Sequence, residues 1–247
     1  MAKLWIDNLT KCFDGNEVLK NLSFHIEEDE FVAILGPSGS GKSTLFHLIG
    51  GLYTPNNGDI LLDGKKINGQ KGSISYMPQT PSLFPWRTVL ENVLLGAELT
   101  GKKEPQAALQ MMEKAGLKGY ENAYPHQLSG GMKQRAAFIR SLLSPQSLIC
   151  LDEPFSALDE FTRSEMQKWL LSIWQQNKRS ILFVTHNIEE ALFLADRILV
   201  LSEKPANIIA EFEVNFPRPR EETITLTEEF LQYKKDIYKI LKKGKLE

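Results

Sequence analysis

The chain has 247 residues, of which 42% are hydrophobic and 24% charged, and its 29 basic and 31 acidic side chains give a formal net charge of −2. This usage is typical of a folded protein with one large domain, or one domain with a subdomain, and it excludes a disordered or fibrous chain. The small net charge gives no bulk electrostatic reason to expect binding to nucleic acid. The two cysteines, Cys12 and Cys150, predict neither a disulfide framework nor a thiolate metal site.

The first residues alternate apolar and polar side chains, so they do not resemble the continuous apolar core of a signal peptide. No stretch approaches the roughly 18–20 apolar residues that are needed to span a bilayer. We therefore expect a cytoplasmic protein that touches a membrane only through partners.

Strands are expected to dominate the first 62 residues. Residues 3–9 and 17–26 alternate apolar and polar side chains, as in antiparallel strands with one wet face. The run 31–35 is entirely apolar, which is typical of a strand buried on both faces, and it leads into a glycine-rich loop. Leucine and isoleucine at helical spacing then predict a helix that ends before Pro55, followed by a short strand at 59–62.

Helices are expected in the middle of the chain. Apolar residues recur at helical spacing between 88 and 116 without a strand pattern, and a further helix is predicted after Gly131. The simplest interpretation is a helical subdomain over about 80–143, inserted into the rest of the domain.

Strands and helices alternate again in the last third of the chain. Apolar strands are predicted at 147–151 and 180–184 on either side of a helix at 160–176, and this alternation favours a parallel sheet wrapped by helices. Two more strands are expected at 197–201 and 208–214. A final helix at 227–243 has apolar residues on one side and many lysines on the other, which favours a solvated basic face.

A phosphate-binding pattern lies between the buried strand and the helix that follows it. The segment 36–44 fits G-x-x-x-x-G-K-[ST], in which glycines let backbone N–H groups surround phosphates, Lys42 reaches the β and γ oxygens, and Ser43 ligates Mg²⁺. The helix that starts there adds its positive dipole end. The expected nucleotide contacts are Gly36, Pro37, Ser38, Gly39, Ser40, Gly41, Lys42, Ser43 and Thr44.

An acidic pair, Asp152 and Glu153, follows the apolar strand at 147–151. In a phosphoryl-transfer site Asp152 would hold the Mg²⁺ shell, and Glu153 would polarise the attacking water. Acidic residues after a strand also commonly cap the next helix, so the pair gains its catalytic interpretation from the phosphate loop.

The segment Leu128-Ser129-Gly130-Gly131-Met132-Lys133-Gln134-Arg135 resembles the signature loop of ABC ATPases. Ser129 and the amides of Gly130 and Gly131, at the start of a helix, would form a second phosphate-binding end. The resemblance implies that this end faces the ATP held by the opposite subunit. A simple helix cap and turn is the structural alternative.

Further matches to this family extend over about residues 3–215. Gln79 resembles the Q-loop glutamine, which implies contact with Mg²⁺ and the attacking water. Asp159 lies in a segment similar to the D-loop that crosses the dimer interface, and His186 resembles the switch histidine that contacts the γ-phosphate. Phe13 stands where the family places an adenine-stacking aromatic, with core packing as the alternative. The remaining histidines are expected to be structural: His25, His47 and His126.

Segments 83–93 and 215–220 resemble the importer branch for nitrate, sulfonate, taurine and pyrimidine thiamine precursors, whereas the short, glycine-rich segment 64–73 departs from it. The implied fold is an α/β P-loop NTPase with a mainly parallel core sheet, an N-terminal antiparallel β subdomain and a helical signature-loop subdomain. The ATPase domain would span 1–220, with an amphipathic helical tail at 221–247.

The resemblance implies an ATPase subunit that works with ATP and Mg²⁺ as a head-to-tail homodimer. Glu153 would be the base, and His186 and Lys42 would stabilise the developing charge. Implied partners are transmembrane permease subunits on the inner face of the cell membrane and, through them, an extracytoplasmic solute-binding protein. Trp86 could be a docking anchor for the permease or a core residue.

Two functions are alternatives to that of a transporter subunit. A soluble ABC ATPase of DNA repair or translation would carry long coiled-coil insertions or a second cassette, and this chain has neither. A non-hydrolytic regulator would not be expected to keep Lys42, Asp152, Glu153 and His186 together.

Overall fold

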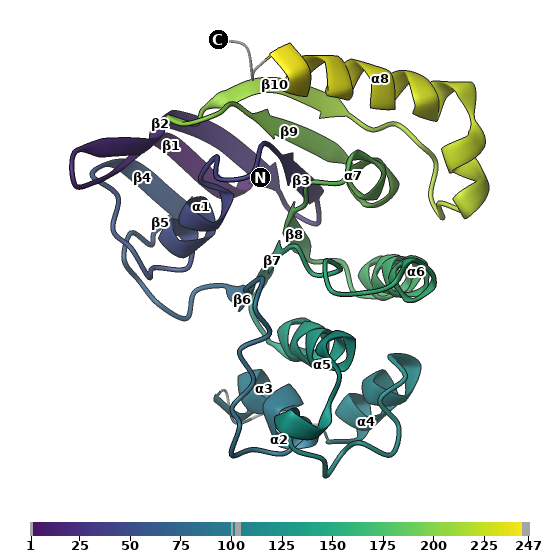
Figure 1. Ribbon diagram of the computed structural model, residues 1–247. Helices are drawn as coiled ribbons and strands as arrows, with labels where there is room; N and C mark the ends of the chain where they lie inside the picture. The colour runs from purple at the N-terminus through teal and green to yellow at the C-terminus, as the bar shows by residue number, and fades with distance from the viewer. Residues whose placement is uncertain (1, 100, 102–104, 244–247) are drawn as a thin grey trace.

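The computed structural model describes residues 2–99, 101 and 105–243, and these form two β-sheets with helices around them (Figure 1). The smaller sheet is antiparallel, with the strand order β2-β1-β4-β5. Its strands are β1 (Ala2–Phe13), β2 (Asn16–Glu27), β4 (Asn57–Leu62) and β5 (Lys65–Lys66).

The larger sheet has the order β10-β9-β3-β8-β7-β6, and only its edge strand β10 runs antiparallel to its neighbour. The predicted antiparallel N-terminal sheet and mainly parallel core sheet are thus confirmed. The strands are β3 (Phe31–Leu35), β6 (Ser75–Met77), β7 (Leu148–Asp152), β8 (Ser180–Val184), β9 (Arg197–Leu201) and β10 (Ile208–Glu213).

The central strands β3, β7, β8 and β9 are buried at every residue because both faces of the sheet are covered. Successive side chains of a strand point to opposite faces, so Phe31 and Ala33 join one hydrophobic cluster while Val32 and Ile34 join the other. The first cluster contains the helices after residue 89, and the second contains the antiparallel sheet and the first helix.

Figure 1 places α2, α3 and α4 near the β6 edge of the core sheet and α8 along the opposite edge, over β10. The helix α2 starts at a capping box, in which Thr88 and Glu91 exchange side-chain and backbone hydrogen bonds. The helices are α1 (Lys42–Ile49), α2 (Val89–Val93), α3 (Leu95–Leu99), α4 (Pro105–Lys114), α5 (Gly130–Leu143), α6 (Glu160–Gln176), α7 (Ile188–Leu194) and α8 (Glu228–Lys243), with 3₁₀ turns at Pro125–Gln127 and Glu222–Leu226.

Two predicted segments extend beyond the described residues. Positions 100 and 102–104 of the expected helical insertion, and positions 244–247 of the expected tail, lie outside them. The proposed division of the chain at 220 and 221 stays a prediction. Among the described residues, no helix combines the length and apolar character needed to cross a membrane.

Candidate active site

The phosphate loop connects β3 to α1, and its geometry requires glycine at Gly41. This residue has φ of 103°, and a Cβ atom there would lie 2.9 Å from Val18 Cγ1. Lys42 begins the helix and is buried, and its Nζ donates hydrogen bonds to the carbonyls of Gly36 at 2.9 Å and Pro37 at 2.7 Å. The ammonium group therefore lies over the loop whose amides would cradle phosphate.

Asp152, the last residue of β7, accepts a hydrogen bond from the side chain of Ser43. Burial raises the pKa of Asp152, although the bond from Ser43 opposes this shift. Burial also lowers the pKa of Lys42, against the attraction of the Glu153 and Asp152 carboxylates. The opposite charges within the site thus offset part of the cost of burying them.

The pair Ser43 and Asp152 fits Mg²⁺. A hydroxyl and a carboxylate are hard oxygen ligands, and Mg²⁺ usually takes one or two carboxylates together with waters and substrate phosphates. Within the described part of the chain there is no cluster of three His, Cys, Asp or Glu side chains that could hold a metal ion without such help.

Two of the expected catalytic side chains approach a third, that of Glu153. Gln79 Nε2 donates to Glu153 Oε2 at 2.9 Å, and His186 Nδ1 lies 3.4 Å from Glu153 Oε1. They come from the segments that follow β6, β7 and β8, which are parallel neighbours in the sheet. The carboxyl ends of parallel strands share one edge, so this order of strands brings the residues together. Gln79, which was also expected to ligate Mg²⁺, binds Glu153 in this structure.

The main chain of Glu153 is fixed by contacts that the sequence did not predict. Glu153 has φ of 48°, in the left-handed region that non-glycine residues seldom adopt. Its N–H donates to the Val184 carbonyl at 3.0 Å. Its carbonyl accepts from Ser156 Oγ at 3.0 Å and N at 3.2 Å, and from Gln134 Nε2 at 3.3 Å. Gln134 is only 1% exposed, so a buried amide of the signature helix supports the backbone of the expected base.

A second group of contacts links the expected switch and D-loop segments. Thr185 Oγ1 donates to Glu190 Oε2 at 2.6 Å, and Arg163 Nε lies 3.6 Å from Glu190 Oε1. Arg163 also donates to the carbonyl of Leu158 at 2.9 Å. Burial raises the pKa of Glu190, while the bond from Thr185 and the Arg163 charge oppose the shift. In the sequence, Thr185, Glu190 and Arg163 could have been noticed only as polar residues close to His186 and Asp159.

The residues expected to act across a dimer cap helices in this chain. Ser129 Oγ accepts from Met132 N at 3.2 Å at the start of α5, and Asp159 Oδ1 accepts from Thr162 N at 3.0 Å at the start of α6. A Cβ atom at Gly130 would meet nothing within 4 Å. Phosphate binding by 129–131 and dimer contact by Asp159 stay predictions.

The aromatic residues lie as follows. Phe13, at the end of β1, is partly buried and packs edge-on against Tyr53 at 5.3 Å between ring centroids, so both adenine stacking and packing remain open. Trp86 is 70% exposed and stacks on Phe84 at 5.1 Å, which excludes the core alternative. Rings of the three other histidines pack against aromatic neighbours: His25 with Trp5, His47 with Tyr53 and Tyr76, and His126 with Tyr124.

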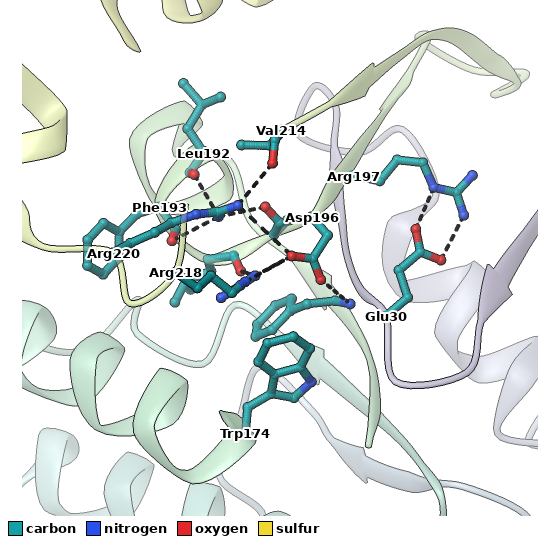
Figure 2. Close-up of polar contacts among 12 residues, drawn as sticks. Glu30, Trp174, Leu192, Phe193, Asp196, Arg197, Val214, Arg218 and Arg220 are labelled. Carbon is teal, nitrogen blue, oxygen red and sulfur yellow. Dashed lines mark hydrogen bonds and ion pairs between the residues drawn. The ribbon is translucent and has the colours of Figure 1, made fainter. Parts of the chain in front are cut away.

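The segment 215–220 anchors the C-terminal part of the chain to α7, the helix directly after the switch segment. Figure 2 shows the Arg220 guanidinium at the end of this helix, where it donates to the carbonyls of Leu192, Phe193 and Ala195 and to that of Val214. Burial, helped by the neighbouring Arg218, lowers the pKa of Arg220 to about 10. Arg220 therefore supplies hydrogen-bond donors to carbonyls at the carboxyl end of α7, which the helix itself leaves without partners.

Comparisons with known proteins agree with this arrangement. The ABC transporter family matches residues 19–156. The chain is 40% identical over 245 positions, 98% of its length and 96% of the relative, to an aliphatic sulfonates import ATP-binding protein, SsuB, of Bacillus cereus. It is 42% identical over 252 positions, 97% of its length and 95% of the relative, to a nitrate import ATP-binding protein, NrtD, of Synechocystis. A dimeric post-hydrolysis state of the ATP-binding cassette MJ0796, bound to ADP and Pi, matches with a TM-score of 0.76 at 30% identity, over 87% of this chain and all of that one (100%).

Proposed function

This chain belongs to the ABC transporter family, and we propose that it is the ATP-hydrolysing subunit of an importer for a small solute of the nitrate, sulfonate, taurine or pyrimidine-precursor type. The observation that carries the proposal is the carboxylate of Glu153, which Gln79 holds at 2.9 Å and His186 approaches at 3.4 Å. A base so placed, beside a phosphate loop and a buried Asp152, is suited to phosphoryl transfer to water.

Each residue has a distinct role in hydrolysis. Backbone amides of 36–41 and Lys42 hold the phosphates of ATP, and Glu153 accepts a proton from the water that attacks the γ-phosphorus as the bond to the β-phosphate oxygen breaks. His186 and Lys42 offset the negative charge that develops. When bound, Mg²⁺ supplies further positive charge to the phosphate oxygens, and Ser43 and Asp152 would hold it.

The segment after Gln79 is suited to dock a permease subunit. Arg140 of α5 donates to the carbonyls of Pro81 and Ser82, at 2.9 and 3.0 Å, so this segment is tied to the signature helix. Asn92, which is fully buried, accepts from the N–H of Phe84 and donates to its carbonyl. The exposed pair of Phe84 and Trp86 is therefore presented on a backbone with a fixed shape, and exposed Trp is a frequent binding hot spot.

Head-to-tail dimerisation at the inner face of the membrane completes the proposal. The amide groups at 129–131 would bind the ATP of a second copy, since a helix N-terminus favours an anion. The permease would pass the solute, delivered by an extracytoplasmic binding protein.

The dimer is tested by two measurements of ATP hydrolysis. Specific activity should rise with protein concentration. An equal mixture of Ser129→Arg and Lys42→Ala chains should regain part of the activity that each chain lacks alone, because one of the two shared sites in the mixed dimer carries neither change. Concentration-independent activity from a verified monomer would refute the shared site.

A further inference from the structure

A cavity of about 620 Å³ lies between the phosphate loop, the segment after His186 and the C-terminal helix α8. Pro37 and Ser38 line one side of it, Ile188 lines another, and Tyr238 and Leu241 of α8 line the third. The cavity therefore combines the polar groups of the candidate active site with apolar side chains from a helix that has no role in the proposed hydrolysis.

The helix α8 is held firmly at this position. Its residues Phe230 and Ile237 are buried in the main hydrophobic cluster, and Lys234 forms an ion pair with Glu189 of α7. Tyr238, by contrast, is 61% exposed on the same helix. This wall of the cavity is thus a well-packed helix, α8, that carries one largely exposed aromatic side chain, Tyr238.

A large exposed hydrophobic side chain also occurs at the start of α6. Phe161 is 85% exposed in the first turn of α6, directly after Asp159 and Glu160. Burying a phenylalanine side chain that is this exposed against a partner would remove a large apolar area from water, which favours association. Ser156, of the loop that leads to α6, shares a smaller cavity of about 50 Å³ with His186 and Asn187, and both of these also line the large cavity.

The loop that leads to Phe161 and the large cavity therefore both border His186. In a two-fold dimer formed around this region, a contact between Phe161 of one copy and the cavity of the other occurs twice. The charges are also compatible, because Asp159 and Glu160 directly precede Phe161, while on the cavity wall Lys234 and Glu189 pair with each other and Lys242 adds a positive charge.

We propose that Phe161 of a second copy inserts into this cavity in the ATP-bound dimer, against Ile188, Tyr238 and Leu241. The helix α8 is then part of the dimer interface and forms a wall of the shared site. This inference rests on the proposed dimer and adds to it a specific contact and a role for the C-terminal helix.

A disulfide between two chains tests the contact directly. Both chains carry Glu153→Gln, to retain ATP, and Cys12→Ser, while the natural Cys150 is fully buried. One chain then carries Phe161→Cys, and the other carries Tyr238→Cys and an N-terminal tag that separates the products by size. Mixed with ATP and Mg²⁺ under mild oxidation, they should form a tagged–untagged disulfide dimer that is absent without ATP. Leu226→Cys, at a position 81% exposed, replaces Phe161→Cys as the matched control and should give none.

Gel filtration of the same mixture separates the possible failures. An ATP-dependent dimer without the disulfide would overturn the contact and leave the proposed dimer intact. A mixture that stays monomeric with ATP would overturn both.

Activity gives a second readout that does not depend on engineered cysteines. Phe161→Ala should raise the protein concentration for half-maximal ATPase activity about tenfold, with Phe161→Leu in between, and the melting temperature of the isolated chain should not change. A lower half-maximal concentration in Tyr238→Ala would mean that α8 obstructs the dimer, and would overturn the proposal.

Discussion

Replacing Gln134 by methionine removes the buried amide that supports the Glu153 backbone while it keeps a side chain of similar length. The amide donates at 3.3 Å to the Glu153 carbonyl, and the Ser156 hydroxyl donates to the same carbonyl at 3.0 Å. Both side chains can support the Glu153 backbone without touching ATP. We therefore expect their loss to misplace the Glu153 carboxylate and leave ATP binding unchanged.

The size of the defect follows from these two bonds. A neutral hydrogen bond contributes roughly 1 kcal/mol net, so loss of the Gln134 bond should lower kcat about fivefold if all of it serves to hold Glu153. Adding Ser156→Ala removes a second bond of this kind, and the double variant should be slower by about 30-fold. The left-handed φ of 48° at Glu153 is the physical reason for the effect, because such a conformation persists only while its surroundings hold it.

The assay compares kcat at saturating ATP with ATP affinity from calorimetry. We expect kcat to fall while the dissociation constant for ATP stays the same. Gln146→Met is the control, since it removes a hydrogen bond of the same length, 3.3 Å, from a glutamine side chain to the Gly72 carbonyl, together with one accepted from Ser144, away from the candidate site. A wild-type kcat in the double variant would refute the positioning role of both side chains.

Three other changes probe charge and burial. Lys42→Ala should weaken ATP binding by roughly 10- to 100-fold in calorimetry, because a charged donor is lost from the phosphates; unchanged affinity would contradict the assignment. Arg220→Met should lower the free energy of unfolding in denaturant by about 3–5 kcal/mol, because several buried carbonyls lose their donor; a loss below about 1 kcal/mol would contradict this. Burial raises the folded-state pKa of Glu190, so its stability contribution is full below the unfolded pKa and is lost as pH rises through the folded one. The melting temperature of the native chain relative to Glu190→Gln should therefore fall as the pH rises above about 4, the unfolded pKa of a glutamate, and a constant difference would argue against the buried charge.

The elements with the strongest patterns could be predicted to the residue. Strands β3, β8 and β9 and the helix α6 have the bounds expected from the sequence. The strand β1 was expected at 3–9 but continues to Phe13. Its last part was missed because the pairing of β1 with β2 shifts register repeatedly after Ile6. Such irregularities interrupt the alternation on which a strand prediction depends.

Short elements were missed for physical reasons. The strand β6 has three residues, too few to show a period, yet it places Gln79 beside Glu153. The helix α7 has seven residues, of which five are buried, so it has no clear polar face. The supporting residues of the site were missed because their contacts are tertiary: Gln134 lies 19 positions before Glu153.

The segment 215–220, which resembles the importer branch of the family, also has a local structural role. Its Arg220 completes the carboxyl end of α7, and Asn187 accepts N–H bonds at the amino end, next to His186. The tail then returns over α7 and buries Phe230 and Ile237 in the same cluster as the core strands. Because α7 is held at both ends and covered by the tail, a displacement of α7 should move the tail as well, and we therefore expect any movement of the segment around His186 that shifts α7 to be transmitted to α8.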